Sequence, residues 1–343
     1  MMTDPRPLIL SCPLPRSLPL ILTEDRLAEL RARYRIVETT DEALPGLPDA
    51  VLAEARYIIG QPPLDAATLA RLASLRCIFN VESNLLNNMP YDEVFRRGIH
   101  VVTTGAVFAQ PVAEIGLGFA LSLLRNIHGA DADFRAGREL WGGEGNGAAR
   151  LLTGAEIGIL GFGDLGRATA RVLAGFAPKL RVYDPWLPAS KLREAGAEPA
   201  GLSEVMAQSD VVFCTAAVTS ENRGFLGAAE FAAMRRGAIF LLLSRADVVD
   251  FAALMAAVRE GHILAASDVF PEEPLAADHP VRSIPGFLLS AHRAGALDIA
   301  FKRMGEMVLE DLALLDRGLP PMVCKRAERE TVARFRSRPV AVN

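Results

Sequence analysis

The chain has 343 residues, of which 50% are hydrophobic and 23% are charged, a balance typical of a folded globular protein and not of a disordered chain. The 37 basic and 41 acidic side chains give a formal net charge of −4, so no overall positive field is available to hold nucleic acid or an anionic membrane surface. Because domains usually contain about 100 to 200 residues, this length favours two domains.

The cysteines and the N-terminal segment indicate a cytoplasmic protein. The four cysteines are Cys12, Cys77, Cys214 and Cys324. They are widely scattered and form no Cys-x-x-Cys pair, so we expect neither a disulfide framework nor a metal site. The first 22 residues are repeatedly interrupted by proline and lack the pattern of a signal peptide. No uninterrupted apolar run of about 18 residues occurs, so we expect a soluble protein without a membrane-spanning helix.

The first hundred residues alternate between short apolar runs and helix-like stretches. We predict strands at 8–10, 57–59, 77–81 and 99–102, with helices at 25–33 and 66–73. This alternation predicts a parallel sheet flanked by helices, because a parallel connection requires a crossover of a dozen or more residues.

A second and longer alternating unit follows. It is preceded by a predicted helix at 111–127, in which Gly116 and Gly118 are placed for close packing, and by a glycine-rich loop at 141–147. We then predict strands at 157–160, 180–183, 211–215, 238–243, 263–266 and 287–290, and helices at 165–176, 202–207, 228–234 and 251–259. An amphipathic helix at 299–315 and a poorly patterned tail from Pro320, expected to be partly mobile, complete the chain.

The sharpest local pattern is a glycine motif that follows a predicted strand and opens a helix. It consists of Gly161, Phe162, Gly163, Asp164, Leu165 and Gly166. In such a unit the glycines allow a tight turn, the approach of a pyrophosphate and close helix packing. Asp184 ends the next strand, where a carboxylate accepts hydrogen bonds from an adenosine ribose and repels a 2′-phosphate, so NAD is favoured over NADP. The alternative is a glycine-rich turn beside an ordinary surface aspartate.

Polar residues at the carboxyl ends of strands are the candidates for catalysis, because ligands bind there in open α/β sheets. Hydride transfer to a nicotinamide needs a proton shuttle, and His292 is the histidine best placed at a strand end. It also needs a cation, which Arg245 supplies after another strand, and Glu273 follows a third. A solvated surface ion pair is the alternative for Arg245 and Glu273.

Further strand ends carry polar residues that we assign to the cofactor site. They are Thr215, Ser244 and Asp268.

Taken together, these segments resemble the D-isomer-specific 2-hydroxyacid dehydrogenases. The matching stretches are 161–166 with Asp184, then 243–250, 267–275 and 290–295, and the similarity spans roughly 99–315. The resemblance implies that Arg245 binds the substrate carboxylate and carbonyl, that His292 is the acid/base, and that Glu273 pairs with the histidine and keeps it protonated.

The same resemblance implies an α/β fold with two doubly wound parallel-sheet domains. A Rossmann-type NAD-binding domain at 104–295 would be inserted in a flavodoxin-like substrate domain made of 1–103 and 296–343, which closes over it. The implied partners are NAD, a small 2-hydroxy or 2-oxo acid and a second copy of the chain in a homodimer. Nucleic acid and membranes are not expected partners.

The sequence departs from this family at three places. Val81, Glu82 and Ser83 are the predicted substrate-binding residues, yet Glu82 stands where glycine is usual, in a loop with extra residues. A carboxylate that points into the site would disfavour a second substrate anion, whereas one turned outward would not. Ala246 after Arg245 and Arg293 after His292 also replace a usual glycine and an apolar residue.

These departures leave a second hypothesis open, a non-catalytic NAD(H)-sensing protein on the same fold. Among enzymes, formate-type relatives usually pair their histidine with glutamine, so Glu273 favours hydroxy-acid chemistry. Oxidation of phosphite or phosphoglycerate also stays open, as does the identity of the 2-hydroxy acid.

Overall fold

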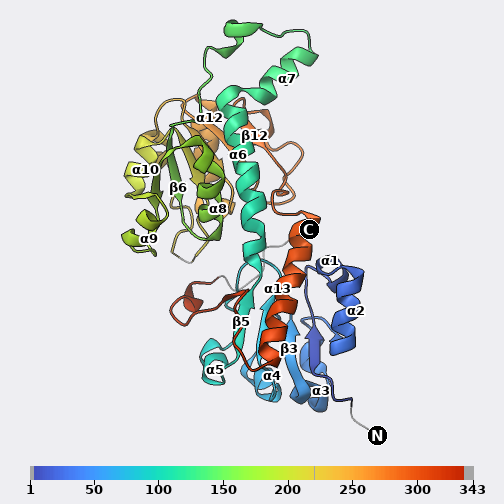
Figure 1. Cartoon of the computed structure of the whole chain (residues 1–343). Coiled ribbons are helices and arrows are strands. Elements are labelled where there is room, and N and C mark those ends of the chain that lie inside the picture. Colours follow the sequence, from blue (N-terminus) through green and yellow to red (C-terminus); the bar gives the residue numbers. More distant parts are fainter. Residues whose placement is uncertain (1–3, 220, 336–343) are drawn as a thin grey trace. The chain divides into compact units, whose positions relative to one another are not determined.

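The computed structural model describes residues 4–219 and 221–335, which form two compact units. One unit contains residues 4–108, 219, 221 and 296–335, and the other contains 109–218 and 222–295 (Figure 1). The second unit is therefore inserted in the sequence of the first. We describe each by itself.

The first unit is built on a six-stranded sheet with the order β13-β5-β4-β3-β1-β2. Its strands are β1 (Leu8–Ser11), β2 (Arg35–Glu38), β3 (Ala55–Ile59), β4 (Cys77–Asn80), β5 (His100–Thr103) and β13 (Lys325–Arg326). The ladders among β1 to β5 are parallel, and β13 pairs antiparallel with β5. The order of the first five strands is the flavodoxin-like one, in which the connections reverse between β1 and β3.

Helices cover both faces of this sheet. One face packs against α1 (Leu18–Ile21), α2 (Glu24–Arg33) and α13 (Asp298–Asp316). The other face packs against α3 (Asp49–Glu54), α4 (Ala66–Arg71) and α5 (Tyr91–Arg96). The strands β1, β3 and β4 are buried on both faces, so their sequences are mostly apolar and do not alternate between apolar and polar residues.

The described part of the tail from Pro320, residues 320–335, is anchored on α13 where it begins. That the tail is partly mobile stays a prediction. Asp311 of α13 is fully buried and accepts backbone N–H bonds from Met322, Val323 and Cys324 at 2.8 to 2.9 Å. Three donors compensate the burial of this carboxylate and fix the start of the tail. Bonds of this kind between a helix and the following tail leave no apolar periodicity in the sequence, so they could not be predicted from it. Residues 336–343 lie outside the described residues.

The second unit contains a seven-stranded sheet with the order β12-β11-β10-β9-β6-β7-β8, all parallel. Its strands are β6 (Glu156–Leu160), β7 (Lys179–Tyr183), β8 (Glu198–Pro199), β9 (Val211–Cys214), β10 (Ile239–Leu242), β11 (Leu264–Ser267) and β12 (Phe287–Leu289). This is the Rossmann order, with the reversal between β6 and β9. The predicted fold class is confirmed.

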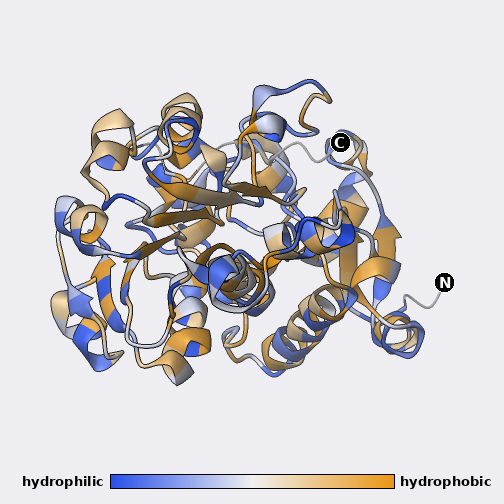
Figure 2. Ribbon diagram, turned by 90° about the horizontal axis from the view of Figure 1, so that it is seen from above, coloured by the Kyte–Doolittle hydropathy of each residue, from blue (hydrophilic) through white to orange (hydrophobic). Residues whose placement is uncertain are grey.

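Two layers of helices enclose this sheet, whose strands are strongly hydrophobic (Figure 2). One face packs against α6 (Ala109–Arg125), α8 (Asp164–Leu173) and α9 (Ala189–Glu194). The other packs against α10 (Leu202–Gln208), α11 (Ala228–Ala233) and α12 (Phe251–Arg259). A further helix, α7 (Ile127–Arg135), extends beyond the end of α6, away from the sheet (Figure 1).

Short 3₁₀ segments connect these elements. They are η1 (Leu44–Gly46), η2 (Gly105–Phe108), η3 (Gly142–Asn146), η4 (Ala174–Phe176), η5 (Ala246–Val248), η6 (Pro280–Ser283) and η7 (Val332–Arg334).

The segment Gly105–Arg125, which contains α6, is long and apolar enough to cross a membrane by length and composition alone. One face of α6 is nevertheless part of the core of the second unit, which makes it a partly buried core helix. A Cβ on Gly116 would lie 2.6 Å from the Leu243 side chain, which confirms the close packing predicted there. The same prediction was wrong for Gly118, which is exposed and has no described atom within 4 Å of a Cβ.

Candidate active site

The glycine motif forms a tight turn between β6 and α8 at the reversal point of the second unit's sheet. Gly161 has a φ of +84°, and a Cβ there would lie 2.6 Å from the backbone of Ala216, so only glycine fits. A Cβ on Gly166 would lie 2.3 Å from the carbonyl oxygen of Gly161. A Cβ on Gly163 would have no described atom within 4 Å, which leaves the N-terminus of α8 open to a phosphate group.

Asp184 and Thr215 hold this turn in place. The two carboxylate oxygens of Asp184 accept the backbone N–H groups of Phe162 at 2.7 Å and Trp186 at 2.9 Å. Each oxygen keeps a second lone pair that a ribose hydroxyl can use. The Thr215 hydroxyl donates to the carbonyl of Gly161 at 2.6 Å. The residues present therefore fit a dinucleotide, and Thr215 supports the turn from the neighbouring strand β9.

Arg245, Glu273 and His292 follow three adjacent strands, β10, β11 and β12. Nδ1 of His292 lies 2.5 Å from Oε2 of Glu273. Because an ionised carboxylate only accepts hydrogen bonds, Nδ1 carries the proton of this bond and Nε2 is left to exchange a proton with another group. Glu273 thus hydrogen-bonds to the histidine.

Glu273 is held as a carboxylate. Burial raises the pKa of Glu273, but the hydrogen bonds from His292 and from the backbone N–H of Phe270, at 2.8 Å, together with the nearby charge of Arg245, lower it by more. The net pKa lies below the ordinary value, so the group is a stable anion beside the imidazole at neutral pH.

Asp268 positions the loop that carries His292. Its carboxylate, 1% exposed, accepts the backbone N–H groups of Arg293 at 3.1 Å and Ala294 at 3.0 Å, and its carbonyl accepts the N–H of His292 at 2.7 Å. His292 itself has a φ of +48°, a left-handed conformation that is uncommon outside glycine. Such strain at a site residue persists because the surrounding bonds determine the conformation.

Arg245 leaves β10 in an extended conformation, with φ −150° and ψ 144°. Its Nη1 donates to the carbonyl of Ser244 at 2.7 Å. Ala246 is buried, starts η5 and does not adopt a positive φ, so this position does not require glycine. The side chain of Arg293 is exposed.

The predicted substrate-binding residues of the first unit follow β4. Val81 is buried in the core, and Glu82 is only 7% exposed, so its side chain is not turned out into bulk solvent. A carboxylate oxygen of Glu82 accepts the Ser83 hydroxyl at 3.0 Å, and the Glu82 N–H donates to the side chain of Asn80 at 3.1 Å. The loop is thus fixed by its own polar groups.

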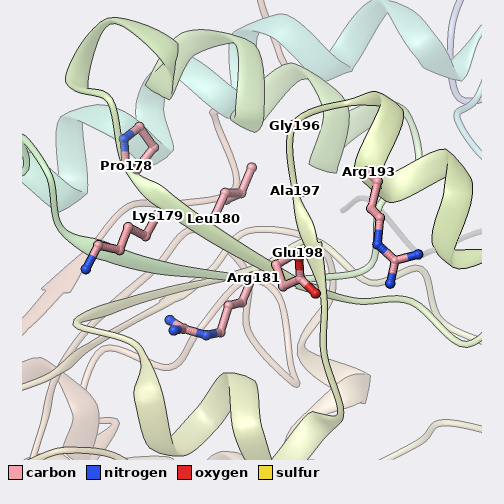
Figure 3. Close-up of a pocket in the computed structure, with 8 residues that line it drawn as sticks. All are labelled: Pro178, Lys179, Leu180, Arg181, Arg193, Gly196, Ala197 and Glu198. Carbon is pink, nitrogen blue, oxygen red and sulfur yellow. The ribbon is translucent and has the colours of Figure 1, made fainter.

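A shallow hollow on the second unit lies away from these residues. It is lined in part by Lys179, Arg181 and Glu198, at the start of β7 and around β8 (Figure 3). Asp184 follows the opposite end of β7, so this hollow is not at the cofactor edge. Its basic groups on β7 are paired with Glu156.

Comparisons with known proteins agree with this geometry. Residues 117–294 match the family model of the D-isomer specific 2-hydroxyacid dehydrogenase, NAD binding domain. A glyoxylate reductase from Korarchaeum cryptofilum is 31% identical over 264 residues, which cover 76% of this chain and 79% of the relative. The chain belongs to the D-isomer specific 2-hydroxyacid dehydrogenase family.

Two further proteins are similar to this chain. A crystal structure described as a phosphoglycerate oxidoreductase from Rhizobium etli has a TM-score of 0.88 and 67% identity, over 95% of this chain and all of that one. A D-3-phosphoglycerate dehydrogenase from Mycobacterium tuberculosis is 27% identical over 87% of this chain and 57% of the relative. The chain is accordingly a nicotinamide-dependent 2-hydroxyacid dehydrogenase or reductase that acts on a CH–OH group.

Two functional features were missed from the sequence. The carboxylate of Asp268, a residue predicted on the cofactor side, also accepts bonds from the loop of His292. The side chain of Gln61, after β3, accepts from Asn80, which in turn supports the Glu82 loop. Neither contact has a local sequence signal, because each joins residues from different strands.

Proposed function

We propose that this dehydrogenase interconverts a D-2-hydroxy acid and its 2-oxo acid, with Arg245, Glu273 and His292 as the residues that act on the substrate. The observation that supports this assignment is the 2.5 Å contact between His292 and Glu273 at a strand end adjacent to that of Arg245. A histidine oriented by an anion and a nearby guanidinium are what carbonyl reduction requires.

In the reductive direction Arg245 holds the substrate carboxylate through charge-assisted hydrogen bonds and polarises the carbonyl. A nicotinamide held at the glycine turn would supply the hydride for C2. Nε2 of His292 donates the proton that the developing alkoxide takes up, while Glu273 stabilises the protonated imidazole through Nδ1. Oxidation follows the same steps in reverse, with His292 as the base.

The cofactor is proposed to be NAD in preference to NADP. The support is Asp184, whose carboxylate lies beside the glycine turn through its bond to the N–H of Phe162. An anion there accepts ribose hydroxyls and repels a 2′-phosphate. We also assign Gly161 to Gly166, Thr215, Ser244 and Asp268 to the cofactor side of the site.

The proposed substrate is a small 2-oxo acid whose carboxylate is also bound by the loop Val81 to Ser83. The names of the similar proteins give two candidates, glyoxylate and a phosphoglycerate-type acid. We further propose that the first unit is the substrate domain and that the second is the NAD-binding domain. The proposed location of the enzyme is the cytoplasm.

A homodimer is proposed to form through the segment around α7. This segment carries several large apolar side chains that are more than half exposed, an arrangement that marks interaction surfaces. They are Ile127, Phe134, Leu140 and Trp141. Sedimentation of the wild type and of Phe134→Asp should give a dimer and a monomer, respectively, and a monomeric wild type would rule the dimer out.

The function is tested with purified protein, NADH and a panel of 2-oxo acids. We expect consumption of NADH by the wild type and by His262→Ala, which removes a histidine just before β11, at the opposite end of that strand from the site. His292→Ala should lose most of the activity, on the order of 100-fold or more, and keep its affinity for NADH. A wild type that binds NADH and reduces none of the panel is instead an NAD(H)-sensing protein.

A further inference from the structure

The loop after β4 leaves the first unit's sheet between the ends of two neighbouring strands. In the sheet β4 lies between β3 and β5, and the three strands run parallel. Because parallel strands bring their carboxyl ends to one edge, residues at the ends of β3 and β5 lie beside the loop. They are Gln61, two residues after β3, and Thr103, the last residue of β5. We call residues 81–86 the substrate loop, after the role proposed for its first three residues.

Gln61 holds the substrate loop from the side of β3. Gln61 is buried, and its Oε1 accepts the side-chain amide of Asn80 at 2.8 Å and the backbone N–H of Leu86 at 3.3 Å. Its Nε2 donates to the carbonyl of Leu86 at 2.8 Å and to Oδ1 of Asn88 at 3.0 Å. Asn80 precedes the loop and Leu86 ends it, so one buried amide bonds to both ends of the loop.

Thr103 holds the middle of the substrate loop from the side of β5. Thr103 is buried, and its hydroxyl donates to the carbonyl of Ser83 at 2.9 Å and accepts the N–H of Gly105 at 3.0 Å. A Cβ on Gly105 would lie 2.0 Å from that carbonyl oxygen of Ser83, so glycine lets the chain after β5 lie directly against the loop. The backbone of an irregular loop needs such partners where it is buried, because unpaired polar groups are costly there.

We propose that Gln61 and Thr103 are positioning residues that keep the substrate loop in the conformation that binds the substrate carboxylate. This inference rests on the proposed function, in which residues 81–83 of the loop bind that carboxylate. Without the two side chains the loop would occupy several conformations, and the apparent affinity for the substrate would fall in proportion to the competent fraction. The glycine turn and His292 belong to the second unit, so the affinity for NADH and the proton transfer should not change.

The test measures KM and kcat at saturating NADH for the 2-oxo acid that the wild type reduces best among glyoxylate, pyruvate and 3-hydroxypyruvate. Gln61→Met keeps the length of the side chain and removes its hydrogen bonds, and Thr103→Val keeps the shape and removes the hydroxyl. Each should raise KM by about 5- to 20-fold, with kcat within about 2-fold of the wild type and the Kd for NADH unchanged. Thr103→Ser, which retains the hydroxyl, should keep the wild-type KM within about 2-fold.

Tyr57→Phe is the matched control, because it removes from a buried side chain of β3 a hydroxyl that donates to Asp316 at 2.8 Å. It should lower the unfolding temperature and leave KM unchanged. If Gln61→Met fails to fold, Thr103→Val and Thr103→Ser still give the comparison. Lower unfolding temperatures with an unchanged KM in the loop variants, or a KM of Thr103→Ser raised as far as that of Thr103→Val, would overturn the inference while the dehydrogenase assignment stands. A wild type that binds NADH and reduces none of the three acids would overturn the proposed function and this inference with it.

Discussion

The contact between His292 and Glu273 predicts a specific loss of activity when the glutamate loses its charge. In Glu273→Gln the amide can keep a hydrogen bond to Nδ1, but the anion that stabilises the protonated imidazole is gone. At an effective dielectric constant of about 20 and a charge separation of about 3.5 Å, the pair attraction is about 5 kcal/mol before desolvation. The side chains of His292 and Glu273 are 32% and 23% exposed, so we take about 2 kcal/mol as the net effect.

This free energy corresponds to about a 30-fold change in rate. Because reduction of a 2-oxo acid uses the protonated histidine, kcat/KM of Glu273→Gln should fall by about that factor.

The assay follows NADH consumption with the 2-oxo acid varied, so that kcat/KM is obtained. The matched control is Glu272→Gln, because Glu272 is the adjacent glutamate and is exposed. Its kcat/KM should equal that of the wild type. A kcat/KM of Glu273→Gln that also equals the wild-type value would refute the assignment of Glu273 as the partner that stabilises the protonated His292.

The other predictions concern the cofactor turn and the folded state. Gly163→Ala should unfold at the wild-type temperature, because its Cβ would contact no described atom. It should bind NADH at least about 10-fold more weakly, because the Cβ lies at the open N-terminus of α8. Gly166→Ala should lower both the stability and the affinity for NADH. Asp184→Ser should raise the NADPH-to-NADH ratio of kcat/KM by about 10-fold or more, and an unchanged ratio would contradict the role given to Asp184. Asp311→Asn should lower the free energy of unfolding by about 2 to 3 kcal/mol in urea titrations, because the buried carboxylate accepts three backbone N–H groups. A loss below about 0.5 kcal/mol would contradict this explanation. The pKa of Glu273 is lower in the folded state than in the unfolded chain. The ionised Glu273 therefore stabilises the fold above its unfolded pKa, and this stabilisation is lost as the pH falls through the folded pKa. The unfolding temperatures of the wild type and Glu273→Gln should therefore converge in acid.

The central strands of both sheets were predictable because burial on both faces makes them continuous apolar runs. Three edge strands lack this signal, because β2 is half-exposed and β8 and β13 contain two residues each. They form because a neighbouring strand offers a partner, which is a tertiary effect.

The candidate site was predictable to the extent that strand ends and motif spacing determine position. Arg245, Glu273 and His292 follow neighbouring strands, and parallel strands bring their carboxyl ends to one edge. The positive φ of His292 and the bonds from its loop to Asp268 were not predictable, because they depend on contacts across 25 or more residues.

The most direct test of the central claim is to follow the hydride itself. NADH with deuterium in both C4 positions of the nicotinamide would be incubated with the protein and a 2-oxo acid other than glyoxylate that it consumes. The product would be analysed by mass spectrometry and chiral chromatography. The account predicts deuterium at C2 of the 2-hydroxy acid, in the D-enantiomer, in the wild type and at a greatly reduced rate in His292→Ala. An L-product, or a product without the label at C2, would contradict it.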